Sequence, residues 1–94
     1  MRLDGEQVDV LKNRLKSLST SAKLYLFGSR VDDDARGGDI DLLVISDKLS
    51  KTDLRLLRIE FFKYFGEQKL DIVLDNGELK NPFVQHIFPK AVLL

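Results

Sequence analysis

The chain contains no cysteine among its 94 residues, which excludes a disulfide framework, a thiolate metal site and a cysteine nucleophile. Its basic and acidic residues balance, 15 of each, so the formal net charge is zero. A protein that binds nucleic acid through a dominant phosphate-neutralising surface is usually basic. The balance therefore disfavours polymerase-type activity on nucleic acid. The chain has a single histidine, His86 in PFVQHIF. A histidine in such a stretch is more often packed against neighbours or exposed on the surface than catalytic.

The chain also lacks a long apolar run. No stretch approaches the ~18 to 20 apolar residues of a membrane-spanning helix. The first ten residues, MRLDGEQVDV, carry acids where a signal peptide would have an apolar core. We therefore expect a cytoplasmic protein with no membrane association. The length suits one domain over residues 1–94, with a single modest core and little material for a second substrate-binding lobe.

Hydrophobic spacing and turn residues divide the chain into a few elements. Helical periodicity predicts one helix from Gly5 to Leu18 after the cap Asp4, and a second that follows Ser50 and ends at Gly66. Strands are expected at Lys23–Phe27, Asp39–Ile45, Leu70–Leu74 and Ala91–Leu94, with a short helical turn from Pro82 through Ile87 that Pro89 ends. The aromatic residues of the second helix, Phe61, Phe62, Tyr64 and Phe65, are expected to be core or partly a partner surface. This order indicates a small α/β or α+β domain with one sheet.

Two aspartates stand two positions apart in the second strand. Both faces of this strand are mostly apolar, which suggests an inner strand covered on both sides. Asp39 and Asp41 would point to the same face, about 6.5–7 Å apart along the chain. Their carboxylates can converge on Mg²⁺, which prefers hard oxygen ligands and would remove the repulsion between like charges. An aspartate at the start of a strand is often only a turn residue, whereas Asp41 is interior to an apolar strand, where aspartate is depleted.

A third carboxylate, Asp71, is interior to the third strand. If that strand lies beside Asp39–Ile45, Asp71 can join the pair on the same face. Three carboxylates from two strands can hold two metal ions about 3.5–4 Å apart, the arrangement used for in-line phosphoryl displacement. We therefore predict a metal site made of Asp39, Asp41 and Asp71.

A glycine and a serine follow the first strand directly. Gly28 would let the backbone approach a ligand, and exposed N–H groups there, with the Ser29 hydroxyl, can cradle phosphate oxygens. On its own such a pair is usually just a turn, and the chain has no P-loop motif. Arg30 and Arg36 can make bidentate contacts to a triphosphate, or can pair on the surface with the acidic tract at 32–34.

These residues together resemble a known family. Gly28-Ser29, a loop, Asp39-Ile40-Asp41 and a later-strand Asp71 are similar to the pattern of the minimal nucleotidyltransferases of the DNA polymerase β-like superfamily. LFGSR and GGDIDLLV match closely, and the likeness extends through KLDIVL to IFPKAVLL, so it covers nearly the whole chain.

The resemblance implies a mixed sheet flanked by helices and transfer of a nucleoside monophosphate, AMP from ATP in particular, to a hydroxyl acceptor. Gly28 and Ser29 would then hold the triphosphate. Asp39 and Asp41 would bind two Mg²⁺ ions, and Asp71 would share one of them and help to deprotonate the acceptor. Minimal members of the family often work with a helical HEPN-domain protein, and some of these pairs are toxin–antitoxin systems in which the enzyme adenylylates the toxin.

The chain departs from the family pattern after Arg30. Many members carry a basic residue two positions later, followed by glycine, where this chain has Asp32-Asp33. Arg36 is the candidate to compensate. The departure favours a second hypothesis, an antitoxin module that binds its partner or a nucleotide without catalysis. A small-molecule acceptor is a third hypothesis.

The apolar end AVLL is expected either to complete its own sheet or to pair with another chain in a homodimer.

Overall fold

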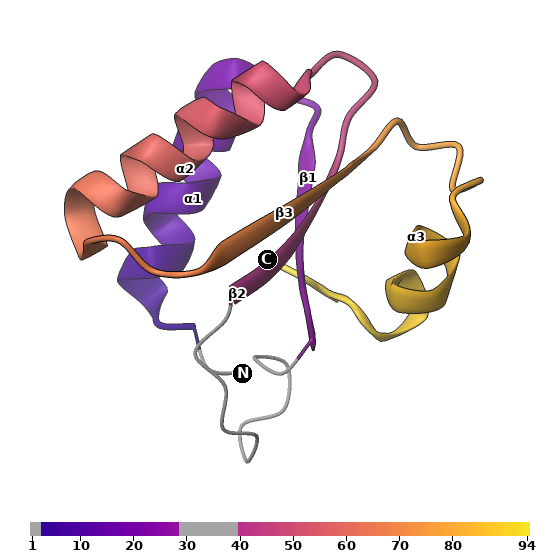
Figure 1. Cartoon of the computed structure of the whole chain (residues 1–94). Coiled ribbons are helices and arrows are strands. Elements are labelled where there is room, and N and C mark those ends of the chain that lie inside the picture. Colours follow the sequence, from indigo (N-terminus) through magenta and orange to yellow (C-terminus); the bar gives the residue numbers. More distant parts are fainter. Residues whose placement is uncertain (1–2, 29–39) are drawn as a thin grey trace.

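The computed structural model describes residues 3–28 and 40–94 (Figure 1). The elements are α1 (Gly5–Leu18), β1 (Lys23–Phe27), β2 (Ile40–Ile45), α2 (Lys51–Phe65), β3 (Leu70–Asp75), α3 (Pro82–Ile87), a 3-10 turn (Phe88–Lys90) and β4 (Val92–Leu93). Both predicted long helices and all four predicted strands are therefore present. No helix in the described ranges is both long and apolar enough to cross a membrane.

Reciprocal side-chain hydrogen bonds start the two long helices. At α1 the Gln7 N–H donates to Asp4 Oδ1 at 2.9 Å, and the Asp4 N–H donates to Gln7 Oε1 at 3.2 Å. At α2 the Ser50 N–H donates to Asp53 Oδ2 at 2.9 Å, and the Asp53 N–H donates to Ser50 Oγ at 3.4 Å. These capping boxes satisfy backbone donors that have no partner within the helix, which confirms both predicted helix starts.

The four strands form one mixed sheet in the order β3-β2-β1-β4. Strand β1 is antiparallel to both β2 and β4, whereas β2 and β3 are parallel. A parallel pair needs a crossover connection, and α2 provides it. The fold is thus the mixed α+β arrangement that the sequence and its resemblance predicted, with β1 and β2 in the centre.

The two faces of the sheet are covered by different elements. Helices α1 and α2 lie together on one face, and α3 lies on the other (Figure 1). The larger core joins the two long helices to the even-numbered residues of the central strands; its fully buried members include Leu11, Leu26, Leu42, Leu57 and Phe61. The smaller cluster, on the odd-numbered face, contains Phe27, Leu43 and Val84. Strand β2 is therefore covered on both sides, as predicted.

The aromatic residues of α2 divide between the core and the surface. Phe61 is completely buried, and Phe62 and Phe65 pack against the core. Tyr64 is 61% exposed, so it is not the core residue that its helical spacing alone would indicate.

Strand boundaries differ in small ways from the predictions. Strand β3 extends one residue further than predicted and includes Asp75, whose backbone pairs with Ile45. The backbone can stay in the strand because it is the Asp75 side chain that takes part in the turn that follows. Its buried Oδ2 accepts the N–H groups of Gly77 at 2.8 Å and of Leu79 at 3.2 Å.

The C-terminal boundaries also differ. Pro89 lies within the 3-10 turn that continues α3, where a proline without an N–H is tolerated. Strand β4 contains only Val92–Leu93, although the Leu94 N–H still donates to the Leu24 carbonyl at 2.9 Å. The C-terminal segment thus completes the sheet of its own chain.

Candidate active site

Asp41 and Asp71 lie side by side on neighbouring strands. They are direct partners in the parallel β2–β3 pairing, one position after the pair formed by Ile40 and Leu70. Side chains at paired positions point to the same face of a sheet, so both carboxylates lie on the α3 side, together with Leu43 and the smaller cluster. Asp41 is half-buried and Asp71 is exposed. The structure therefore brings these two predicted ligands together.

Gly28 lies directly against the Asp41 side chain. Its φ is +77°, a conformation that residues with a side chain rarely adopt. A Cβ added at this position would collide with Asp41 Oδ2 and would lie 3.1 Å from Asp41 Cγ. The turn after β1 thus brings backbone close to the carboxylate, an approach that only glycine permits.

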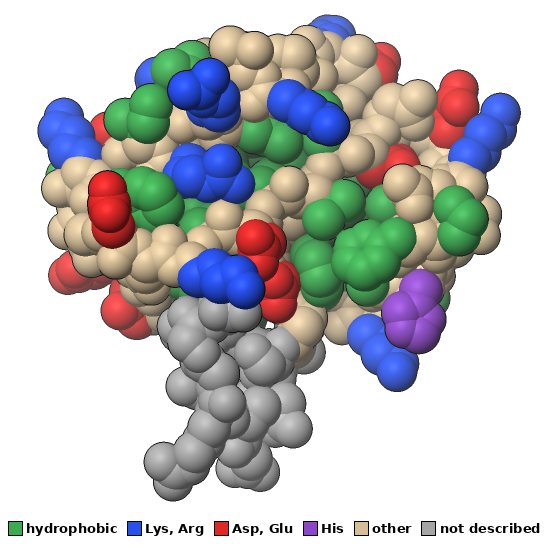
Figure 2. All heavy atoms as spheres, in the orientation of Figure 1, with side chains coloured by type: hydrophobic (Ala, Val, Ile, Leu, Met, Phe, Trp, Pro, Cys, Tyr) green, Lys and Arg blue, Asp and Glu red, His purple; other side chains and the backbone are tan. Residues whose placement is uncertain are grey.

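Phe27 lies beside Asp41 on β1, the strand on the opposite side of β2 from Asp71. It is the Cα partner of Asp41 in the antiparallel β1–β2 pairing, and it is 8% exposed. The Phe27 ring belongs to the smaller apolar cluster under α3. Asp41 therefore stands where the apolar face of the sheet ends, between an aromatic core residue and a second carboxylate. Figure 2 shows acidic side chains bordering a hydrophobic patch on this side of the molecule.

Several predicted site residues fall outside the described ranges. They are Ser29, Arg30, Arg36 and Asp39. In residues 3–28 and 40–94 no group of three histidine, cysteine or acidic side chains is placed to hold a metal ion. The two described aspartates supply hard carboxylate oxygens on one face, which suits Mg²⁺ rather than a softer metal. The donor chemistry of this pair therefore fits the predicted cation.

His86 does not take part in this site. It lies in the last turn of α3 and is exposed, one of the two placements expected for it.

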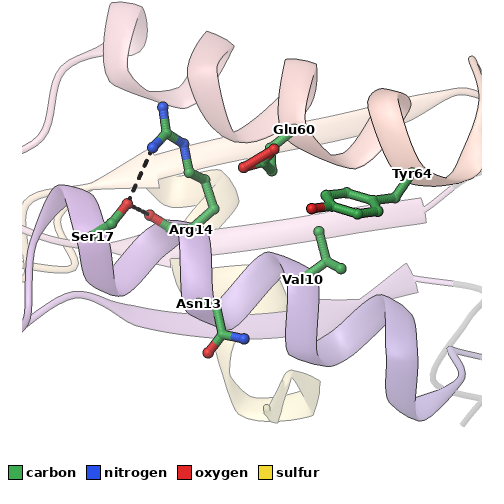
Figure 3. A pocket seen from close by; sticks show the side chains of 6 residues that line it. All are labelled: Val10, Asn13, Arg14, Ser17, Glu60 and Tyr64. Carbon is green, nitrogen blue, oxygen red and sulfur yellow. Dashed lines mark hydrogen bonds between the residues drawn. The ribbon is translucent and has the colours of Figure 1, made fainter.

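A separate groove lies between α1 and α2. It encloses about 270 Å³ and is lined by Val10, Asn13, Arg14, Ser17, Glu60 and Tyr64 (Figure 3). Arg14 Nη1 donates to Ser17 Oγ at 3.4 Å, and the Ser17 hydroxyl donates to the Arg14 carbonyl at 2.6 Å. Because α1 and α2 cover the opposite face of the sheet from Asp41 and Asp71, this groove is not part of the carboxylate site.

Comparison with known proteins agrees with the fold. Residues 8–92 match the family described as "Nucleotidyltransferase domain", and the chain belongs to this family. Membership supports transfer of a nucleotidyl group as the general activity. No curated protein matches the chain.

Proposed function

We propose that this protein is a Mg²⁺-dependent nucleotidyltransferase that transfers AMP from ATP to a hydroxyl of a helical HEPN-type partner protein, as an antitoxin. The observation that supports it most directly is the in-register pair of Asp41 and Asp71, with the Gly28 turn packed against Asp41. Two adjacent carboxylates beside a glycine turn suit a site that binds a metal–triphosphate complex. The HEPN partner, the AMP donor and the antitoxin role rest on the family resemblance.

The residue roles follow from this proposal. Asp39, Asp41 and Asp71 would hold Mg²⁺, which when bound neutralises charge on the triphosphate and on the leaving pyrophosphate. The backbone at Gly28 and Ser29 would hold the triphosphate, together with Arg30 and Arg36 as cationic contacts.

In the transfer step the acceptor hydroxyl oxygen bonds to the α-phosphorus of ATP. The bond from that phosphorus to the bridging oxygen breaks, and pyrophosphate leaves. The hydroxyl proton passes to the carboxylate of Asp71, which is exposed and so can meet an acceptor that arrives from solvent. Because Asp71 is exposed, a hydroxyl of a second molecule can reach it and serve as the acceptor.

The proposal is tested by label transfer from α-labelled ATP with Mg²⁺ to a HEPN-domain protein from the same genome. We expect label on that protein with the wild type, and none with Asp41→Asn or Asp71→Asn. Asp9→Asn is the matched control, because Asp9 is an exposed aspartate of α1, on the opposite side of the sheet. Transfer that persists in Asp41→Asn would refute the site assignment.

A second function is favoured by the Asp32-Asp33 sequence, which replaces the basic residue and glycine of the family pattern. In that case the chain is a non-catalytic antitoxin that binds its partner. It would form a stable complex with the partner, transfer no label, and neutralise the partner equally well as wild type and as Asp41→Asn.

A further inference from the structure

Phe83 is a large apolar side chain that the fold leaves half-exposed. It is the second residue of α3, and 50% of its surface is accessible. Its backbone is held in place, because the Phe83 N–H donates to Oδ1 of Asn81 at 2.8 Å. Asn81 is the N-cap of α3 and directly precedes Pro82. The ring is thus carried by a fixed backbone position rather than by a loose loop.

The Phe83 ring lies next to the side chain that pairs with Asp41. Its centroid is 6.0 Å from that of Phe27, with an angle of 75° between the ring planes. Phe27 is in turn the cross-strand partner of Asp41, whose other neighbour is Asp71. The exposed ring is therefore one aromatic contact and one strand pairing away from the carboxylates, on the same face of the sheet.

We propose that Phe83 is the stacking surface for the base of the nucleotide that this site binds. The inference rests on the proposed function. A nucleoside triphosphate has its charge at one end and a flat aromatic base at the other. The described face offers the matching pair of features, carboxylates for metal-bound phosphates and an exposed ring beyond Phe27.

Stacking on an aromatic side chain is tolerant of base identity, because every base has a π-face. Phe83 would therefore strengthen binding of all four nucleotides, and that of purines most, because their ring surface is larger. It would not by itself select ATP over GTP.

The chain offers a matched control for this residue. Among the described aromatic side chains, Tyr64 is the other exposed one, at 61%. It belongs to α2, on the opposite side of the sheet, where it lines the groove between α1 and α2 (Figure 3). Either substitution removes a ring that is largely exposed to solvent, but of the two residues only Phe83 lies on the carboxylate face.

The first experiment compares Mg²⁺-ATP with Mg²⁺-tripolyphosphate, which has the phosphates but no base, by calorimetry. We expect Phe83→Ala to weaken ATP binding about tenfold and to leave tripolyphosphate unchanged. Phe83→Tyr should retain the wild-type affinity for ATP, and Tyr64→Ala should change neither ligand. An unchanged ATP affinity, or an equal loss for both ligands, in a folded Phe83→Ala protein would overturn the inference.

The same comparison separates this inference from the proposed function. If wild type binds tripolyphosphate and this binding requires Asp41, but the affinity for ATP is unchanged in Phe83→Ala, only the stacking role fails. If wild type binds neither ligand, the nucleotide site itself fails, and the stacking role fails with it.

A second readout does not depend on removal of the ring. The chain contains no tryptophan, so Phe83→Trp introduces a single tryptophan, which can be excited selectively over the two tyrosines, at the proposed stacking position. We expect Mg²⁺-ATP to quench its fluorescence and Mg²⁺-tripolyphosphate to leave it unchanged. Tyr64→Trp should respond to neither ligand. Equal quenching at both positions, or none at position 83 when ATP is bound, would overturn the inference.

Discussion

Gly28 is packed so closely against Asp41 that a single added carbon atom would displace the carboxylate. The contact joins the turn after β1 to a side chain of β2, which is the neighbouring strand. The glycine thus has two separate requirements, a positive φ and an absence of side-chain volume.

These requirements can be separated by two alanine substitutions. Gly66 has a φ of +79° but has no atom within 4 Å of an added Cβ, so Gly66→Ala measures the backbone cost alone, about 1–3 kcal/mol. Gly28→Ala should cost more in the free energy of unfolding and should also abolish nucleotidyl transfer, because Asp41 is displaced. Urea denaturation and the label-transfer assay measure the two effects. Equal costs for the two substitutions would contradict the importance of the contact.

Mg²⁺ together with ATP should stabilise the wild type through the two aspartates. At 100 times the Kd, a ligand that binds only the folded state adds about 2.7 kcal/mol. For a domain of this size that is on the order of 10 °C in Tm. Asp41→Asn and Asp71→Asn should lose most of this shift, whereas Asp9→Asn should keep it. Differential scanning fluorimetry with and without EDTA gives the measurement, and a full shift in Asp41→Asn would refute the ligand role.

Phe61 is expected to be a major source of stability. It is completely buried between α2 and the sheet, so Phe61→Ala removes apolar contacts and leaves a cavity. The expected loss in the free energy of unfolding is about 3–5 kcal/mol. Ile59 is 60% exposed on the same helix, and Ile59→Ala should change stability by no more than about 0.5 kcal/mol. Urea denaturation distinguishes these results, and similar losses for both would show that the core is not the one described.

Asp75 is expected to stabilise the turn after β3 through its side chain. Asp75→Ala removes the acceptor of the Gly77 and Leu79 N–H groups, and should cost about 1–3 kcal/mol. Asp75→Asn keeps an oxygen acceptor and should recover most of that loss. Because this turn lies at the other end of β3 from Asp71, neither substitution should alter ATP binding. Thermal unfolding and calorimetry test both statements.

The elements were largely predictable because their signals are local. The capping box of Asp4 and Gln7, the similar box at Ser50, and the short apolar run of β2 each depend on residues a few positions apart. The end of β3 was less predictable. Asp75 belongs to a turn signal in sequence, but its backbone still pairs with Ile45, and strand pairing depends on a distant segment.

The candidate site was only partly predictable for the same reason. The sequence predicted that Asp71 would join Asp41 on the condition that their strands are neighbours, which the parallel register satisfies. It contained no sign that Phe83 would be exposed, or that its ring would meet Phe27. That contact joins residues more than 50 positions apart, and no local pattern encodes it.

The sequence by itself therefore determined the element types, the family and the residue types suited to a metal and a triphosphate, since each depends on local pattern and side-chain chemistry. Tertiary structure alone decided which of these residues meet. The β2–β3 register places Asp71 beside Asp41, the β1–β2 register places Phe27 and the Gly28 turn against it, and the docking of α3 brings Phe83 to the same face. These placements depend on how two faces of one sheet are buried, which is a property of the whole folded chain.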